Sequence, residues 1–166
     1  MYVVAQPKDQ YFTSGGFMKI AIGCDHAGVS LKNKIIPLLK GLDLQWDDLG
    51  TKDEQSVDYP DFGEKVSIEV SKGAVDRGIL ICGTGIGMSI VANKFPNVRA
   101  ALCSDVYSAE MSRLHNDANL LVLPGRIIDS NKAEEIVEVW FKTDFEGGRH
   151  QRRLDKIKAL EARLKD

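Results

Sequence analysis

Short apolar runs that alternate with helical patterns constrain the fold of this chain more than any other feature. Most of these runs are continuously apolar, which is typical of parallel strands that are covered on both faces. Strands that alternate with helices predict a three-layer, Rossmann-like α/β fold in which helices flank a five-stranded parallel sheet. The strands are expected at residues 19–23, 44–48, 78–82, 98–103 and 119–123.

Helical spacing of apolar residues predicts the segments between and after the strands. Pro37 lies inside the first of these patterns and should kink or shorten that helix. Ser130 or Asn131 is expected to cap a later helix. The apolar positions that mark the helices are Leu31, Ile35, Leu38 and Leu39, then Phe62, Val66 and Val70, then Ile136, Val137, Trp140 and Phe141, and finally Leu154, Ile157, Leu160 and Leu164.

The length of 166 residues is typical of one domain with a real core. We expect residues 18–166 to form this domain and residues 1–17 to be a disordered extension, with Met18 as a possible alternative start. The net charge of −2 gives no general attraction to nucleic acid or to acidic membranes. No apolar run approaches the roughly 20 residues that span a bilayer.

The same features predict a cytoplasmic protein. Residues 3–5 are too short an apolar run for the core of a secretory signal. Three cysteines without an export signal are expected to be reduced thiols, and their spacing matches no zinc-binding pattern.

Chemically useful residues follow several of the predicted strands. Ligands of doubly wound sheets bind beyond the carboxyl ends of the strands. Asp25 and His26 follow the first strand, Cys82 ends the third, and Arg126 follows the fifth. An acid, an imidazole, a thiol and a guanidinium should therefore converge on one edge of the sheet.

The stretch from Cys82 to Gly87 is the most informative motif of the chain. It is neither a Walker A loop nor a dinucleotide fingerprint, because its spacing is Gly-x-Gly-x-Gly. The loop is either a tight turn between strand and helix or a cradle of backbone N–H groups for a negative oxygen. Cys82 is either a small buried hydrophobe or, at the start of a helix, a thiolate base. Cys24 and Cys103 are expected to be core residues.

Other residues at this edge also allow two interpretations. Asp25 could cap a helix or bond substrate hydroxyls, and His26 could lie on the surface or meet a phosphate. Thr84 could simply cap the helix that follows the glycine loop.

His115 and Asn116 need a separate explanation, because they precede the fifth strand. This position lies at the amino ends of the strands, and a five-residue strand spans about 16 Å. One subunit should therefore not bring His115 to its own Cys82. Either His115 is only a polar helix end, or a second subunit supplies it; we predict a dimer with active sites across its interface.

The segment from Glu146 to Arg153 is locally basic. It is either a solvated helix start or a phosphate clamp, because Arg149 and Arg153 are four residues apart and share a helical face. With His26 and Arg126, these cations on a mildly acidic protein favour a small phosphorylated ligand over a polymer.

These pieces together resemble the ribose-5-phosphate isomerase B family, which includes the galactose-6-phosphate isomerase subunits. The resemblance runs from Met18 to the last helix. The matching segments are residues 23–28, 58–60, 81–87, 92–94, 115–119 and 146–150.

The resemblance implies a Rossmann-like dimer or dimer of dimers, without metal or cofactor, that interconverts ribose 5-phosphate and ribulose 5-phosphate in the pentose phosphate pathway. It implies that Cys82 is the base that moves the proton between C1 and C2. Thr84 or His115 would assist ring opening. One branch of the family has a glutamate base where this chain has Met88, so the chain resembles the cysteine branch.

The resemblance also implies the substrate contacts. The loop amides, including those of Gly83, Gly85 and Gly87, would hold the enediolate. The contacts to sugar oxygens would come from Asp25, Tyr59 and Asn116. The contacts to the phosphate would come from His26, Arg149, Arg153 and Arg126. The partner subunit would supply His115, Asn116 and the arginines.

Three alternatives stay open at this point. The substrate could be a six-carbon sugar phosphate such as allose 6-phosphate or galactose 6-phosphate. The protein could instead be a sugar-phosphate-binding module without catalysis. A thiol redox protein is a weaker interpretation, since the chain has no Cys-x-x-Cys pair.

Overall fold

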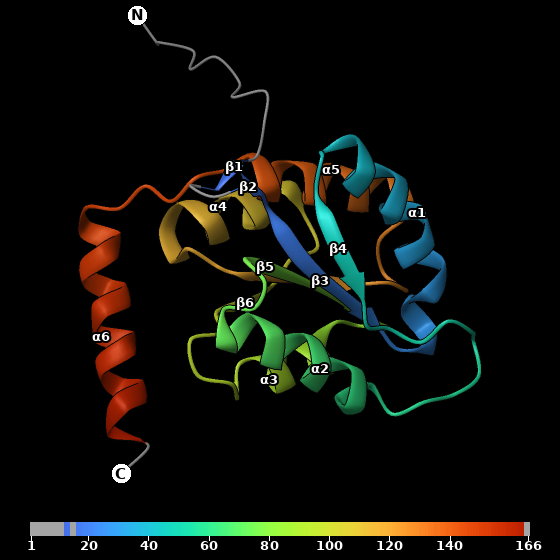
Figure 1. The fold of residues 1–166 in the computed structure, drawn as a ribbon, viewed down its shortest axis with the longest axis horizontal. Helices are drawn as coiled ribbons and strands as arrows, with labels where there is room; N and C mark the ends of the chain where they lie inside the picture. The colour runs from blue at the N-terminus through green and yellow to red at the C-terminus, as the bar shows by residue number, and fades with distance from the viewer. Residues whose placement is uncertain (1–11, 14–15, 165–166) are drawn as a thin grey trace, which may run out of the picture.

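A five-stranded parallel sheet lies between two layers of helices in the computed structural model, which describes residues 12–13 and 16–164 (Figure 1). The strands are arranged in the order β4-β3-β5-β7-β6, so β3 and β5 are neighbours near the centre. This arrangement confirms the predicted α/β fold. The strand bounds are β3 Lys19–Cys24, β4 Gln45–Asp48, β5 Arg77–Cys82, β6 Ala100–Leu102 and β7 Leu120–Pro124.

Helices α1, α4 and α5 cover one face of the sheet, and α2 and α3 cover the other (Figure 1). Helix α6 extends away from this body at the left of the view. The helical elements are the short 3-10 helix η1 His26–Gly28, α1 Val29–Gly41, α2 Tyr59–Lys72, α3 Ile86–Ala92, α4 Val106–Asn116, α5 Ser130–Lys142 and α6 Arg149–Arg163.

The central strands are apolar without interruption because both of their faces are buried. Ile79 and Ile81 of β5 pack into the core under α1 and α5, whereas Leu80 and Cys82 pack into the core under α2 and α3. Successive side chains of a strand point to opposite faces, so a two-sided core needs apolar residues at consecutive positions.

The shortening predicted at Pro37 and the predicted caps of α5 were wrong. Helix α1 continues past Pro37 to Gly41. Pro37 is exposed, so the carbonyl that loses its N–H partner lies on the solvent side of the helix. Helix α5 is capped by Asp129, whose side chain accepts a hydrogen bond from the Lys132 N–H.

Most of the predicted extension, residues 1–17, lies outside the described residues, so its disorder stays a prediction. The start at Met18 also stays a prediction. Within it, β1 Phe12–Thr13 pairs with β2 Gly16–Phe17 in a short antiparallel sheet. Among the described helices, none has the length and apolar character needed to cross a membrane.

Candidate functional site

Asp25 and Cys82 lie side by side at the carboxyl ends of two neighbouring strands. In the register of β3 and β5, Cys24 is opposite Ile81, and the Asp25 N–H donates to the Ile81 carbonyl at 3.2 Å. The main chain therefore sets the spacing between the acid and the thiol. We call the group at this end of the sheet the carboxyl-edge cluster; it comprises Asp25, His26, Tyr59, residues 82–87 and Arg126.

The loop after Cys82 requires glycine at two positions. Gly85 has φ +76°, and a Cβ there would lie 2.3 Å from Cδ1 of Leu102. A Cβ on Gly87 would lie 2.6 Å from the ring of Tyr59, so this ring packs directly on the loop. The Thr84 hydroxyl accepts a hydrogen bond from the Ile86 N–H at 3.3 Å, a turn contact within the loop; the N-cap position of α3 is Gly85, which offers no side chain.

Asp25 and His26 are held by backbone N–H groups. Asp25 Oδ1 accepts from the Ala27 N–H at 2.9 Å, so Asp25 caps η1. His26 Nδ1 accepts from the Val57 N–H at 3.2 Å, which leaves the ring proton on Nε2. The His26 side chain is thereby hydrogen-bonded to the loop that leads into α2.

Arg126 lies against the start of the glycine loop. The backbone N–H of Arg126 donates to the Gly83 carbonyl at 3.0 Å. A Cβ on Gly83 would lie 3.5 Å from Cδ of the Arg126 side chain. The structure therefore brings the predicted acid, imidazole, thiol, tyrosine and this arginine to one edge of the sheet.

A buried ion pair between Lys32 and Asp48 lies next to the same edge of the sheet. The sequence analysis did not predict this pair. Lys32 is 2% exposed, and its Nζ lies 2.8 Å from both carboxylate oxygens of Asp48 and 3.0 Å from the Thr51 carbonyl. These bonds fix the beginning of the loop between β4 and α2. Asp48 interrupts the apolar run of its strand for this reason.

All three cysteines are buried. Cys24 is 0% exposed, Cys103 is 1% exposed, and Cys82 is 4% exposed at the end of its strand. Burial raises the pKa of Cys24 to about 11 and also raises the pKa of Cys103, so both are neutral thiols at pH 7. Both are core residues, as predicted; the thiolate form of Cys82 stays a prediction.

His115 and Asn116 end helix α4, on the opposite side of the sheet from Cys82. The strand that follows, β7, begins at Leu120 opposite Gly78, whereas its last residue is opposite Cys82. A strand of this length separates its two ends by about 16 Å. The structure therefore places the predicted site residues in two separate groups.

The second group is assembled around a buried histidine. The rings of His115 and His150 stack with centroids 4.1 Å apart and an interplanar angle of 5°. The Arg149 Nε–H donates to His150 Nε2 at 3.2 Å, and Nη1 of Arg153 lies 3.4 Å from His150 Nδ1. Glu146 Oε2 lies 3.8 Å from Nε2 of both imidazoles. We call these residues, together with Asn116, the amino-edge cluster.

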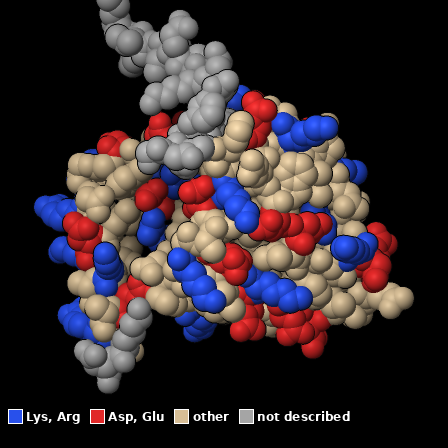
Figure 2. All heavy atoms as spheres, viewed as in Figure 1, with Lys and Arg blue, Asp and Glu red and all other residues tan. Residues whose placement is uncertain are grey.

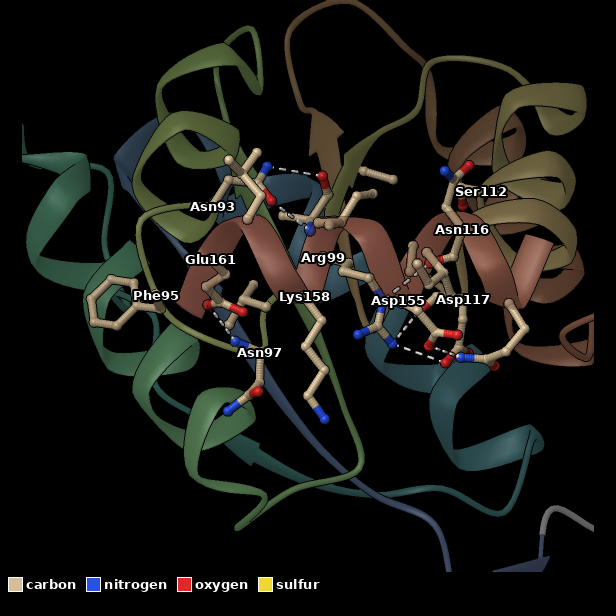
Figure 3. A pocket seen from close by; sticks show the side chains of 18 of the residues that line it. Asn93, Phe95, Asn97, Arg99, Ser112, Asn116, Asp117, Asp155, Lys158 and Glu161 are labelled. Atoms are coloured by element: carbon tan, nitrogen blue, oxygen red, sulfur yellow. Dashed lines mark hydrogen bonds and ion pairs between the residues drawn. The ribbon is translucent and has the colours of Figure 1, made fainter. Parts of the chain in front are cut away.

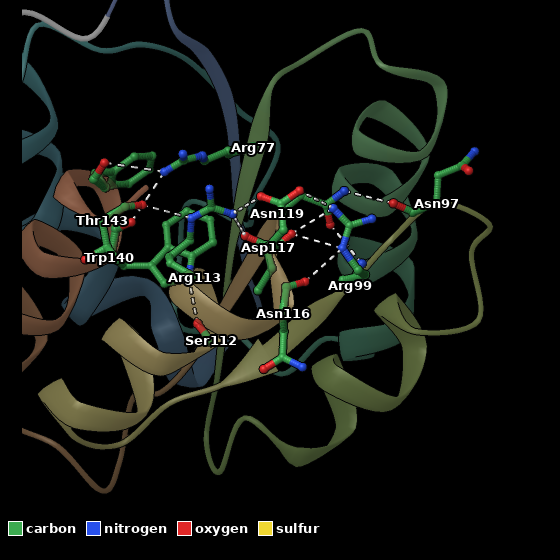
Figure 4. Close-up of polar contacts among 12 residues, drawn as sticks. Arg77, Asn97, Arg99, Ser112, Arg113, Asn116, Asp117, Asn119, Trp140 and Thr143 are labelled. Carbon is green, nitrogen blue, oxygen red and sulfur yellow. Dashed lines mark hydrogen bonds and ion pairs between the residues drawn. The ribbon is translucent and has the colours of Figure 1, made fainter. Parts of the chain in front are cut away.

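Asn116 is held by the turn that follows α4. Asp117 has φ +43°, a conformation that costs energy for a residue with a side chain. Its two carboxylate oxygens accept hydrogen bonds from Arg113 at 2.8 Å and from Arg99 at 2.9 Å (Figure 4). Arg99 Nε also donates to the Asn116 carbonyl at 3.1 Å. The two arginines thus fix the turn that carries the predicted site residues.

Three side chains of the amino-edge cluster form a potential ligand set for a metal ion. The ligand atoms of His115, Glu146 and His150 lie within 4.8 Å of one another. Arg149 and Arg153 lie beside the same imidazole, and their positive charges oppose a cation there. The charges of this group favour an anion.

A groove of about 750 Å³ separates α6 from the body next to this cluster (Figure 3). Asn116 and Asp117 line one side, and α6 forms the other. Ile157 and Leu160 of α6 are exposed, as is Leu164 directly after it. In Figure 2 basic side chains gather over α6, while acidic and basic groups are mixed over the rest of that face.

His150 is the residue of this site whose role the sequence analysis missed. His150, Leu154 and Ile157 have the spacing i, i+4, i+7 that marks one face of a helix. The buried His150 and Leu154 show that this face packs on the body. The sequence therefore contained a helical-face pattern that included His150, but this pattern was less distinct than the spacing of Arg149 and Arg153.

Comparison with known proteins places this chain among sugar-phosphate isomerases. A family model described as Ribose/Galactose Isomerase matches residues 20–157. Ribose-5-phosphate isomerase B of Escherichia coli is 47% identical over 145 residues, which are 87% of this chain and 97% of the relative. D-erythrulose-4-phosphate isomerase of Pectobacterium atrosepticum is 42% identical over 84% of this chain and 93% of that protein.

The fold agrees with a solved structure of the same kind. Ribose-5-phosphate isomerase B of Clostridium thermocellum superposes with a TM-score of 0.86 at 51% identity, over 89% of this chain and 99% of the other. The match to the family model, over residues 20–157, includes both clusters and the strands between them. This chain therefore belongs to the ribose/galactose isomerase family, in the ribose-5-phosphate isomerase B group.

Proposed function

We propose that this protein interconverts ribose 5-phosphate and ribulose 5-phosphate, with Cys82 as the base. The observation that supports this most is the carboxyl-edge cluster, in which a thiol ends a central strand beside Asp25 and a glycine loop. The names of the relatives at 47% and 51% identity point to the same substrate.

The proposed chemistry moves one proton between neighbouring carbons. In the aldose-to-ketose direction the Cys82 thiolate takes the proton from C2, and the C2–H electrons form the enediolate double bond. The thiol then returns the proton to C1, while a proton passes from O2 to O1. The charge develops on oxygen, so the N–H groups of residues 83–87 would act where it forms; removing one such donor costs about 2.7–4 kcal/mol in a comparable site.

The phosphate provides binding energy at a distance from the reacting carbons. His26 and Arg126 belong to the carboxyl-edge cluster, and they would hold the phosphate from one side. Arg149 and Arg153 of the amino-edge cluster would hold it from the other. Asp25, Tyr59 and Asn116 would contact the sugar oxygens, and Thr84 or His115 would assist ring opening.

A dimer would bring the two clusters together, because one subunit holds them at opposite edges of its sheet. In this proposal each active site combines the carboxyl-edge cluster of one protomer with the amino-edge cluster of the other, and two dimers could assemble further. The apolar residues exposed on α6 and the groove beside it support such an assembly.

A cytoplasmic location belongs to the same proposal. The three cysteines are unpaired, and reducing compartments maintain free thiols. Cell fractionation of the native host would test it: activity in a membrane or secreted fraction would contradict it.

The decisive experiment compares kcat/KM on four-, five- and six-carbon sugar phosphates, with solvent deuterium as a second readout. We expect the highest value for ribose 5-phosphate and deuterium at C2 of the recovered aldose. A higher value for a six-carbon substrate would instead favour allose 6-phosphate or galactose 6-phosphate, in line with the family description. Preference for a tetrose phosphate would agree with the Pectobacterium relative. A protein that binds these sugars without incorporating deuterium would be a binding module.

A further inference from the structure

His150 is a buried imidazole that takes part in none of the proposed chemical steps. It is 3% exposed and opens the first turn of α6. One face of its ring lies on His115, and its two nitrogens approach Arg149 and Arg153. A single side chain therefore touches His115, one of the two proposed ring-opening residues, and two of the four proposed phosphate ligands.

The hydrogen bond from Arg149 determines the form of the ring. His150 Nε2 accepts from the Arg149 Nε–H at 3.2 Å, so Nε2 carries no proton and the proton lies on Nδ1; the approach of Arg153 Nη1 to Nδ1 at 3.4 Å is then a contact between two donors and not a hydrogen bond. This requires a neutral imidazole. An imidazolium would have no acceptor for Arg149 and would add a third positive charge beside the two arginines.

The surroundings favour the neutral form. The charged or titratable groups that face the ring are His115 from α4, Glu146 from the preceding loop, and Arg149 and Arg153 from its own helix. Desolvation, with the positive neighbours, lowers the pKa of His150, while Glu146 opposes this shift. The ring is thus a neutral acceptor near pH 7.

Each contact fixes a different degree of freedom. An arginine side chain loses about 1.5–2 kcal/mol of rotamer freedom when it is ordered, and an acceptor that holds Nε in advance removes part of this cost from ligand binding. The parallel stack fixes the plane of the His115 ring and so the direction of its nitrogens.

We propose that His150 is a positioning residue: its Nε2 orients Arg149 toward the substrate phosphate, and its ring face orients His115 for opening of the sugar ring. The proposal rests on the proposed function, because it assigns the roles of these neighbours through that reaction.

Two substitutions separate the two contacts. His150→Phe keeps an aromatic face for His115 but removes the acceptor for Arg149. His150→Gln keeps an acceptor near the position of Nε2 but removes the face. For His150→Phe we expect KM for ribose 5-phosphate and Ki for inorganic phosphate to rise about tenfold, with kcat within threefold of wild type. For His150→Gln we expect kcat to fall about tenfold, with Ki for phosphate nearly unchanged.

The split between the two variants is the test. A merely structural role for His150 would lower stability and shift both parameters together in both variants, and this would overturn the proposal. Unchanged kinetics in either variant would also overturn it. Lys156→Ala, an exposed position on the same helix, serves as the control and should behave as wild type. Urea unfolding of each variant reports whether the fold is retained.

Failure of the proposed function would be visible separately. If wild-type protein does not isomerise ribose 5-phosphate, the proposed function is wrong. If wild type is active but the His150 variants fail to show the split, only the positioning role is wrong. Binding of inorganic phosphate, measured by calorimetry, requires no turnover and tests the Arg149 contact alone.

Discussion

The two clusters of this protein are built by different means. The carboxyl-edge cluster takes its geometry from main-chain bonds: neighbouring strands align Asp25 with Cys82, and glycines shape the loop that follows Cys82. The amino-edge cluster takes its geometry from side chains, above all the stack of His115 on His150. The first type of site follows from strand and turn patterns, whereas the second depends on how α6 packs against α4.

The largest expected effect separates chemistry from binding. Cys82→Ala should lower kcat by about 10³- to 10⁴-fold, because it removes the proposed base for the C2 proton. Solvent deuterium exchange at C2, measured by NMR, should fall equally, while Ki for inorganic phosphate stays near wild type. Cys103→Ala, which removes another buried thiol, is the control; near-normal exchange in Cys82→Ala would exclude it as the base.

The next experiment tests whether the clusters cooperate between subunits. Cys82→Ala damages one cluster and His115→Asn the other, so each variant alone should be nearly inactive. Mixed and refolded together, they should form heterodimers with one intact site, and random pairing predicts about a quarter of wild-type activity. Recovery of no activity, with heterodimers shown by native mass spectrometry, would mean that each site lies within one subunit.

A smaller effect should come from the main-chain geometry of the glycine loop. Gly85→Ala places a Cβ 2.3 Å from Leu102 at φ +76°, so we expect kcat to fall about 10- to 100-fold with a loss of stability. Gly73→Ala is a matched control, since Gly73 has φ +69° but no atom within 4 Å of the added Cβ. It should lose stability but not activity. Equal kinetics in both variants would show that the loop conformation does not matter for turnover.

The smallest expected effect concerns the thiol beneath the carboxyl edge. The folded-state pKa of Cys24 is about 11, above its ordinary value of 9.0. Between these pH values the unfolded chain loses the proton first, so the free energy of unfolding should fall as the pH rises from 9 to 11. Cys24→Ala should remove part of this slope in urea titrations at pH 8, 9.5 and 11. An equal slope in wild type and variant would contradict the pKa shift.

Most of the fold was predictable because the three central strands, β3, β5 and β7, are buried on both faces. All five strands were predicted within two residues of their positions in the structure, including the short edge strand Ala100–Leu102. Pro37 was misleading because its effect depends on whether the freed carbonyl faces water, which local sequence does not reveal. The cap at Asp129 was missed by one or two positions.

The residues whose positions are determined by the main chain could be grouped from the sequence, whereas those positioned by side-chain packing could not. Asp25, His26, Tyr59 and Arg126 come together where strand ends and the glycine loop require it. Lys32 and His150 could not be assigned, because their roles depend on which side chains meet them across the core. The opposite placement of His115 followed from topology alone.

The alignment of Cys24 with Ile81 has a practical consequence for redesign. Since hydrogen bonds between adjacent strands determine the separation of the carboxylate and the sulfur, exchanging residues 52–58 should leave that separation intact, whereas residues 49–51 bond to β3 and to Lys32 and should be kept. This segment touches His26 through Val57 and leads into Tyr59. Libraries limited to it would therefore vary the room for the proposed substrate while the spacing of Asp25 and Cys82 is kept.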